Sequence, residues 1–175
     1  MKRSDELREL MLRFYDAMGS GDTAFVDRHF SRDPDARAIG TDPQEWWSGP
    51  RVVEVFKEQL DAMGGRMPFT PGDPEAYVEG SVGWVADRVA FILPDGGELP
   101  CRVTCVLHRE DGEWKFVQSH ASVGVANEEA FGEPRPSSQR VRLIPQHGRR
   151  TALVSGLSST SLRGRATRAC FARGR

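Results

Sequence analysis

Two polar side chains in the second half of the sequence are of the types that move protons or orient a polar ligand. His120, in the stretch "QSHAS", is the best candidate for a general base, because the pKa of histidine lies near neutrality. Asp87 is the one charge on a face of a predicted strand whose other members are apolar. A charge in that position predicts a polar cluster around Asp87 that orients a carbonyl or carboxylate group of a ligand.

The partner of Asp87 depends on how its strand pairs with the next one. If the hairpin closes with Leu93 opposite Glu98, Asp87 faces Thr104 and lies diagonal to Arg102. A charge on an apolar face is costly without such a partner. The cluster could orient a ligand, or it could be a structural or an exposed ion pair.

The sequence does not decide which face of the sheet carries His120. A two-residue turn at Asp111 and Gly112 places it on the side opposite Thr104, whereas a longer loop with a bulge places it beside Thr104. A lone histidine in a strand is also commonly a structural residue that only forms hydrogen bonds.

Two adjacent tryptophans, Trp46 and Trp47, lie in the loop "GTDPQEWWSGP". Successive residues of an extended chain point in opposite directions, so one indole can face the core while the other meets a ligand or a partner. With Tyr15, Phe56 and Trp84, one of them would line a mostly apolar pocket suited to a small organic ligand.

Other kinds of chemistry find no support in the sequence. No nucleophile elbow, phosphate-binding loop or metal-ligand spacing is present, so we expect neither a metal nor a cofactor. The three cysteines are an odd number and form no CxxC motif. No apolar run is long enough to span a membrane and no signal peptide begins the chain, which predicts a cytoplasmic protein.

The elements that must position these residues follow from hydrophobic periodicity. An amphipathic helix is expected over residues 4–19, a short helix after Asp22, a strand over 36–40 and a third helix that begins near Pro50. Alternating patterns then predict strands over residues 75–80, 82–93, 99–109 and 113–123. Helices followed by an antiparallel meander indicate an α+β fold, with the helices on one face of a curved sheet.

This order of elements resembles the NTF2-like cone fold, and more narrowly its SnoaL-like branch. Four stretches within residues 4–128 carry the resemblance: "RFYDAMGSGD", "IGTDPQEWWSG", "GSVGWVADRVAF" and "DGEWKFVQSHASVGV". It implies a conical domain with a ligand pocket, a bacterial origin and a homodimer formed through the sheet. The steroid-isomerase-like chemistry of some members uses a tyrosine of the first helix, where this sequence places Phe14, with Tyr15 one position away.

The charge distribution divides the chain. Residues 1–133 carry 14 basic and 25 acidic side chains, a net charge of −11, whereas residues 134–175 carry ten arginines and no acid. We therefore expect a domain over residues 1–130 and a disordered Arg/Ser-rich tail over 131–175. The tail could bind nucleic acid, fold back on the acidic domain, or be the product of a shifted reading frame.

Three functions remain open from the sequence. The first is a small-molecule-binding domain with no assigned reaction, acting as a sensory or regulatory module. The second is an enzyme, such as an isomerase, cyclase or hydrolase, that acts on a cyclic carbonyl compound resembling a polyketide. Its base would be His120, and Asp87 and Arg102 would position the substrate. The third is a dimerisation scaffold that binds no ligand.

Overall fold

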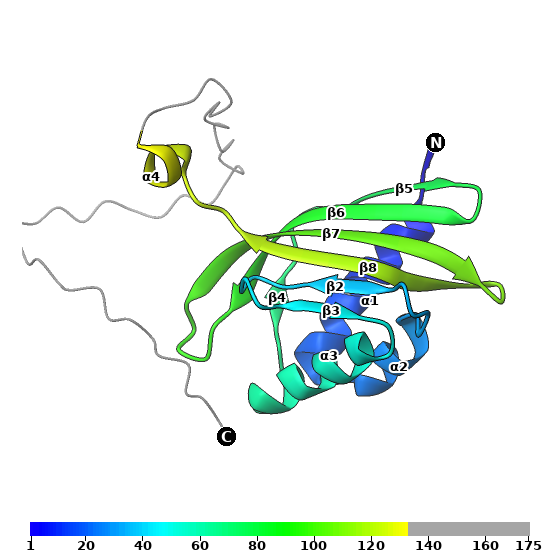
Figure 1. Cartoon of the computed structure of the whole chain (residues 1–175), viewed down its shortest axis with the longest axis horizontal. Helices are drawn as coiled ribbons and strands as arrows, with labels where there is room; N and C mark the ends of the chain where they lie inside the picture. Colours follow the sequence, from blue (N-terminus) through cyan, green and yellow to red (C-terminus); the bar gives the residue numbers. More distant parts are fainter. Residues whose placement is uncertain (133–175) are drawn as a thin grey trace, which may run out of the picture. The chain divides into compact units, whose positions relative to one another are not determined.

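The computed structural model describes residues 1–132, so the tail predicted at 131–175 lies almost entirely outside the described residues. Within them, the helices α1, α2 and α3 lie together on one side of a curved sheet (Figure 1). The α+β class predicted from the sequence is therefore confirmed. The helices are α1 (Asp5–Ser20), α2 (Thr23–His29), α3 (Arg51–Ala62) and a short α4 (Asn127–Phe131).

The sheet follows the order β1-β5-β6-β7-β8-β2-β3, and a short β4 pairs with β6. Every pairing is antiparallel except that of β2 with β8. The strands are β1 (Lys2–Arg3), β2 (Arg37–Ile39), β3 (Trp46–Ser48), β4 (Phe69–Thr70), β5 (Glu75–Glu79), β6 (Val82–Ile92), β7 (Glu98–Glu110) and β8 (Glu113–Val123). The long strands agree with the predicted ones to within a residue or so, whereas β1, β3 and β4 were not predicted.

Helix α1 begins and ends at the signals that the sequence offers. The Ser4 hydroxyl accepts a hydrogen bond from the Leu7 amide at 3.3 Å, which satisfies one of the free amides of the first turn. Gly21 ends the helix in the left-handed conformation, with φ of 75°. The buried face between these ends carries Leu7, Leu10, Met11, Phe14, Tyr15, Ala17 and Met18.

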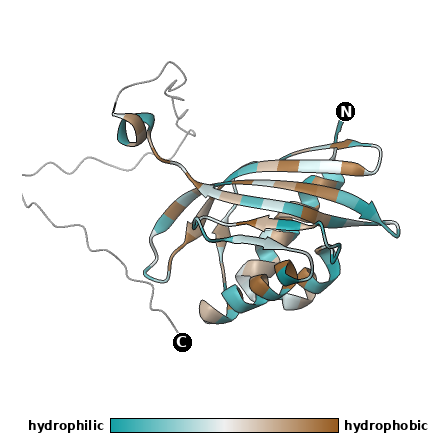
Figure 2. Ribbon diagram, in the orientation of Figure 1, coloured by the Kyte–Doolittle hydropathy of each residue, from teal (hydrophilic) through white to brown (hydrophobic). Residues whose placement is uncertain are grey.

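We call the side of the sheet that carries α1–α3 the inner face and the opposite side the outer face. Along β7 the buried residues alternate with more exposed ones, so Cys101, Val103 and Cys105 point inward and Arg102 and Thr104 point outward. Figure 2 shows hydrophobic and hydrophilic residues interspersed along the long strands in agreement with this alternation. The core thus lies between the inner face and the helices.

Aromatic rings occupy the part of the core around Phe14. Its ring centroid lies within about 6 Å of five others, at distances of 5.8, 6.2, 5.7, 6.0 and 5.6 Å from Tyr15, Phe25, Phe30, Phe56 and Phe116. Such tilted and edge-on contacts stabilise a core beyond the area that they bury. The position that the resemblance assigned to a tyrosine therefore holds a structural phenylalanine.

The register of the β6–β7 hairpin differs from the predicted one. The last pair is Ile92 with Glu98, not Leu93 with Glu98, because Leu93 bonds to Gly97 inside the turn through its amide at 2.8 Å. Because successive residues of a strand point to opposite faces, a shift of the register by one residue replaces an outward-pointing partner with an inward-pointing one. Asp87 therefore lies opposite Val103 on the inner face, and the predicted cluster with Thr104 and Arg102 does not form.

A bulge in the middle of β8 decides the face of His120. The β7–β8 turn is the short one at Asp111 and Gly112, but the register shifts between Val106 and Leu107, where β8 carries an additional residue. His120 is consequently the cross-strand partner of Thr104 and shares the outer face with it. A bulge within the strand thus has the effect that the sequence analysis ascribed to a longer loop.

Candidate functional site

A buried hydrogen bond joins the first helix to the centre of the sheet. The Tyr15 hydroxyl, on α1, donates to the Asp87 carboxylate, on β6, at 3.2 Å. Both side chains are almost inaccessible, with exposed fractions of 2% and 7%. Within residues 1–132, Asp87 is the one charged side chain in the buried set, so its partners decide what this part of the core can do.

Two backbone amides complete the shell of Asp87. Gly72 donates to Oδ2 at 3.3 Å and Arg88 donates to Oδ1 at 2.8 Å. A Cβ at Gly72 would lie 2.2 Å from the Arg88 carbonyl oxygen and 2.5 Å from Asp87 Oδ1, so only glycine fits there. Three donors satisfy the carboxylate, which therefore ties together α1, β6 and the loop before β5.

The protonation state of Tyr15 follows from this arrangement. Burial, and next the negative charge of Asp87, raise the pKa of Tyr15 well above its ordinary value. The phenol therefore stays neutral and its proton remains bonded to Asp87. Tyr15 can present an edge of its ring as an aromatic wall, but it does not have a free proton to donate to an oxyanion.

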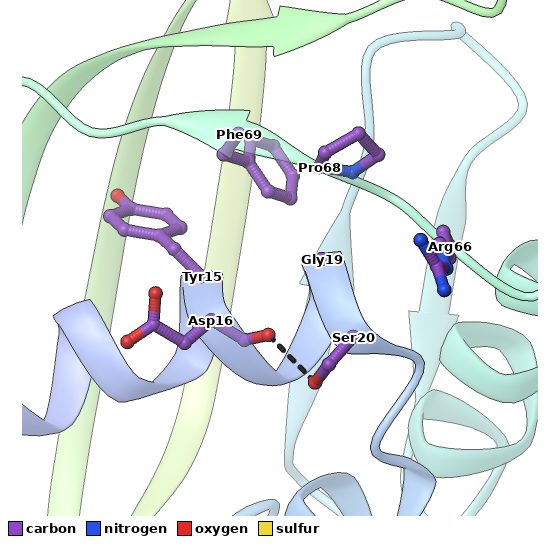
Figure 3. A pocket seen from close by; sticks show the side chains of 7 residues that line it. All are labelled: Tyr15, Asp16, Gly19, Ser20, Arg66, Pro68 and Phe69. Carbon is purple, nitrogen blue, oxygen red and sulfur yellow. Dashed lines mark hydrogen bonds between the residues drawn. The ribbon is translucent and has the colours of Figure 1, made fainter.

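Tyr15 forms the inner wall of an open hollow of about 420 Å³ between α1 and the segment that leads into β4. We call it the Tyr15 hollow. Figure 3 shows its lining: Tyr15, Asp16, Gly19, Ser20, Arg66, Pro68 and Phe69. The ring of Tyr15 lies 5.4 Å from that of Phe69, centroid to centroid. Aromatic rings, two opposite charges and one hydroxyl thus line a hollow that is open to solvent.

The two sides of the Tyr15 hollow are held together by backbone contacts. The Met67 amide donates to the Met18 carbonyl at 2.9 Å, at the end of α1. A Cβ at Gly21 would lie 2.2 Å from the Gly65 carbonyl oxygen, so the end of α1 and the α3–β4 connection pass very close to each other. The hollow is therefore framed by packed main chain and not by free loops.

The residues that the sequence analysis singled out divide between the two faces of the sheet. Tyr15, Trp47, Phe56 and Asp87 lie on the inner side, whereas Trp46, Trp84, Arg102, Thr104 and His120 lie on the outer side. Among these residues, only Tyr15 lines the Tyr15 hollow, and Asp87 forms the hydrogen bond that holds Tyr15 in place. His120 and Asp87 do not meet, so the structure does not bring the two predicted catalytic residues into one site.

The tryptophan pair separates as an extended chain requires. Trp47 pairs with buried Ala38 and packs against the core, whereas Trp46 pairs with Ile39 and is 65% exposed. The choice that the sequence left open is therefore settled in favour of Trp47 as the inward residue. Neither indole lines the Tyr15 hollow.

Three residues that position the site were missed from the sequence. Arg66 lies directly before the stretch "MPFTPGDP", and Phe69 and Gly72 lie within it, in a part of the chain where the sequence analysis predicts no helix or strand. A glycine next to prolines does signal a special backbone position, but not what it approaches. The contact between Gly72 and Asp87 exists only because α1 and β6 meet there.

A second hollow, of about 450 Å³, lies between α1 and α2 and includes Arg13, Phe25, Arg28 and His29. The Nδ1 atom of His29 is buried and has no hydrogen-bond partner within residues 1–132. Burial, followed by the positive charges of Arg13, Arg28 and Lys115, lowers the pKa of His29, while the Trp114 main chain opposes this. The imidazole is therefore held neutral.

The sequence profile of the SnoaL-like domain matches residues 7–126. The chain belongs to the SnoaL-like domain family. The match includes α1, Asp87 and the whole meander, and so confirms the resemblance drawn from the sequence. A search of curated protein sequences found no significant match.

Solved structures share the fold of this SnoaL-like domain at low sequence identity. A candidate dehydratase of the NTF2-like family from Streptomyces avermitilis has a TM-score of 0.60 and 18% identity, covering 70% of this chain and 96% of its own. An NTF2-like protein of unknown function from Pseudomonas putida KT2440 has a TM-score of 0.59 and 18% identity, covering 67% and 83%. A protein with a cystatin-like fold from Caulobacter vibrioides has a TM-score of 0.58 and 17% identity, covering 71% and 91%. These likenesses establish the fold and no activity.

Residues 1–132 offer neither a membrane-spanning helix nor a metal-binding group of side chains. In the part of the chain that the structure describes, no helix is both long and apolar enough to cross a membrane. The same residues contain no group of three or more His, Cys, Asp or Glu side chains that could hold a metal ion.

Replacing Tyr15 with phenylalanine tests the buried pair. Tyr15→Phe removes one hydrogen bond to a buried charge and should lower the free energy of unfolding by about 2 kcal/mol. Urea denaturation followed by circular dichroism measures it. The matched control is Tyr77→Phe, which removes the bond between the Tyr77 hydroxyl and Glu75 at the surface and should cost under about 0.5 kcal/mol. Equal losses in the two variants would contradict a special role for the pair.

His29 should make the domain sensitive to acid. Because its pKa is lower in the folded than in the unfolded chain, its contribution to stability is fully present above about 6.5, the ordinary pKa of histidine. This contribution is lost as the pH falls toward the lowered folded value, where only the unfolded chain takes up the proton. Urea midpoints measured from pH 8 to pH 5 should fall less steeply in His29→Leu than in the wild type. Parallel curves would show that His29 has no such role.

Proposed function

We propose that this SnoaL-like domain binds a small organic ligand in the Tyr15 hollow and carries out no acid–base chemistry there. The observation that carries the proposal is the buried Tyr15–Asp87 bond at the inner wall of a hollow that is open to solvent. A buried charge costs stability unless it is fully paired. Such a buried pair at the wall of an opening is consistent with a wall that must be held in a fixed position.

The lining of the Tyr15 hollow supports binding by a ring-containing compound. Pro68 and Phe69 present apolar surface, and Arg66, Asp16 and Ser20 supply a few polar groups at the rim. Polar and apolar surface contribute about equally to the exposed lining, so a ligand would meet both a ring-binding wall and polar groups that fix its orientation. The framing contacts at Met18 and Met67 keep the walls in place before a ligand arrives, which lowers the entropy cost of binding.

The enzyme hypothesis has weaker support. A base must lie within hydrogen-bond reach of the proton that it removes. His120 lies on the outer face beside Thr104, whereas Tyr15 and Asp87 are on the inner face. The Tyr15 hydroxyl donates its proton in a hydrogen bond to Asp87, so the Tyr15–Asp87 pair has a structural role. A reaction in the Tyr15 hollow would need a different acid or base.

The outer face supports a second proposal, that two copies of the chain pair through their sheets. Tyr77 and Trp84 stack there with centroids 5.8 Å apart, and Val82 and Trp46 are 40% and 65% exposed. Exposed aromatic and aliphatic side chains on one face are typical of contact surfaces. Such a homodimer would leave the helices, and with them the Tyr15 hollow, open to solvent.

Native mass spectrometry of the full chain, purified gently from cells, tests the binding proposal. We expect a small adduct that is released on activation, and its loss in Phe69→Ala, because that ring lines the Tyr15 hollow. The matched control is Phe91→Ala. Phe91 is the cross-strand partner of Phe69, 5.4 Å from its ring, but does not line the hollow.

Two results would contradict the binding proposal. One is an adduct that both variants lose equally, which would point to the core and not to the hollow. The other is a wild-type chain that carries no adduct and, in a fragment screen followed by ligand-detected NMR, binds no compound whose signal Phe69→Ala removes.

A charge placed at the centre of the outer face tests pairing. Thr104→Glu puts a carboxylate between Ala86 and His120, where a second sheet would bury it, and should shift the chain from dimer to monomer by at least about tenfold in the dissociation constant. Sedimentation velocity measures the change. Ser81→Glu, with the same charge in the β5–β6 turn, should leave the dimer intact. A wild-type chain that is already monomeric, or equal effects of both variants, would contradict the proposal.

A further inference from the structure

Two charged side chains at the rim of the Tyr15 hollow have no partner in the protein. Asp16 projects from α1, and Arg66 projects from the α3–β4 connection on the other side of the hollow, as Figure 3 shows. Neither side chain forms an ion pair or a hydrogen bond within residues 1–132. One negative and one positive group, both exposed, therefore lie at opposite ends of the lining of the Tyr15 hollow without neutralising each other.

Some other long charged side chains on the helices do find partners, although those of Arg13 on α1 and Asp61 on α3 form no ion pair within residues 1–132. The Arg51 guanidinium lies 2.6 Å from the Glu58 carboxylate, and the Lys57 ammonium lies 2.6 Å from that of Asp27. The helices thus hold some of their opposite charges in close pairs. At the Tyr15 hollow the two opposite charges are instead held apart, with Pro68 and Phe69 along one wall.

We propose that the ligand of the Tyr15 hollow is a zwitterion of the amino-acid class with an aromatic or bulky apolar side chain. Arg66 would bind its carboxylate, Asp16 its ammonium group, and the ring would lie on Pro68 and Phe69. This inference rests on the proposed function, since it specifies the chemical class of the compound that binds there. An arginine fork matches a carboxylate, and a free carboxylate matches an ammonium group.

The zwitterion is favoured over a simple acid or a simple amine by desolvation. A ligand with only a carboxylate would cover Asp16 and remove part of its water without offering it a partner, and a ligand with only an amine would do the same to Arg66. Covering an unpaired charge is unfavourable, whereas covering two charges with their complements is not. The rim of the Tyr15 hollow therefore selects against ligands that carry a single charge.

The fixed frame of the Tyr15 hollow supports this selectivity. Asp16 belongs to a helix whose end is bonded to Met67, the residue directly after Arg66. The backbone positions that carry the two charges are thus set by one hydrogen bond and by the close approach of Gly21 to Gly65. Selection between ligands by charge spacing requires such a frame, because two freely moving side chains would adapt to any compound.

Three probes that share one ring test the inference on the full chain: L-phenylalanine, 3-phenylpropionate and 2-phenylethylamine. They differ only in which charges they carry. Titrations followed by NMR should show phenylalanine binding about fivefold more tightly than each of the others, since each partly exposed charge pair contributes modestly. The absolute affinities are expected to be weak, so the comparison among the three probes carries the test.

Variants at the rim should remove the preference one charge at a time. Asp16→Asn should abolish the preference for phenylalanine over 3-phenylpropionate, and Arg66→Gln should abolish the preference over 2-phenylethylamine. The matched controls are Glu9→Gln and Arg8→Gln, which change the same charges on α1 but outside the hollow. The controls should keep the wild-type order of affinities.

The outcomes separate this inference from the proposed function. If 3-phenylpropionate binds as tightly as phenylalanine and Asp16→Asn changes nothing, the zwitterion is wrong while binding in the Tyr15 hollow stands. The same holds if none of the probes binds but another fragment does, in a manner that Phe69→Ala removes. If no fragment binds in that manner, the proposed function fails and this inference fails with it.

Discussion

The rest of this domain depends on how one buried carboxylate is satisfied. Asp87 sits in the middle of an inward-facing row of apolar side chains, where an unpaired charge would be strongly destabilising. Its three donors come from α1, from β6 itself and from the loop before β5. Satisfying the charge therefore fixes the first helix and that loop against the sheet, and the Tyr15 hollow lies beside the resulting junction.

The same bond limits the proton chemistry that Tyr15 can perform. A phenol that donates to a buried carboxylate keeps its proton and supports a wall, whereas a catalytic phenol must be free to donate to the reacting oxygen. The arrangement of Tyr15 and Asp87 resembles a catalytic pair in residue type only. This is the reason why we propose ligand binding for the Tyr15 hollow.

The sequence predicted most of the fold because the relevant signals are local. The helix that begins after Ser4, the cap at Asp22 and the alternating pattern of β6–β8 each depend on neighbouring residues. The short strand at Trp46 and Trp47 was not predicted, because it forms only by pairing with β2. Strands of two or three residues have little pattern of their own, so their existence is decided by distant parts of the chain.

The candidate site was much less predictable, because it depends on register. A single residue in the β6–β7 turn decides whether Asp87 lies opposite Val103 or Thr104, and a single additional residue in β8 decides the face of His120. Neither choice leaves a clear mark in composition or periodicity. The pairing of Tyr15 with Asp87 also needs α1 to cross the sheet at one position, which no stretch of sequence encodes alone.

The most direct test of this account is the ionisation of Tyr15 in the folded chain. The protein has two tyrosines, so labelling the Cζ carbon of tyrosine gives two signals, and that of Tyr15 is assigned by its loss in Tyr15→Phe. We predict that it keeps the chemical shift of a neutral phenol as the pH is raised past about 10, the ordinary pKa of tyrosine, for as long as the chain stays folded. A Tyr15 signal that titrates near that pH in the folded protein would show that the phenol is neither buried nor bonded to Asp87, and would contradict the account.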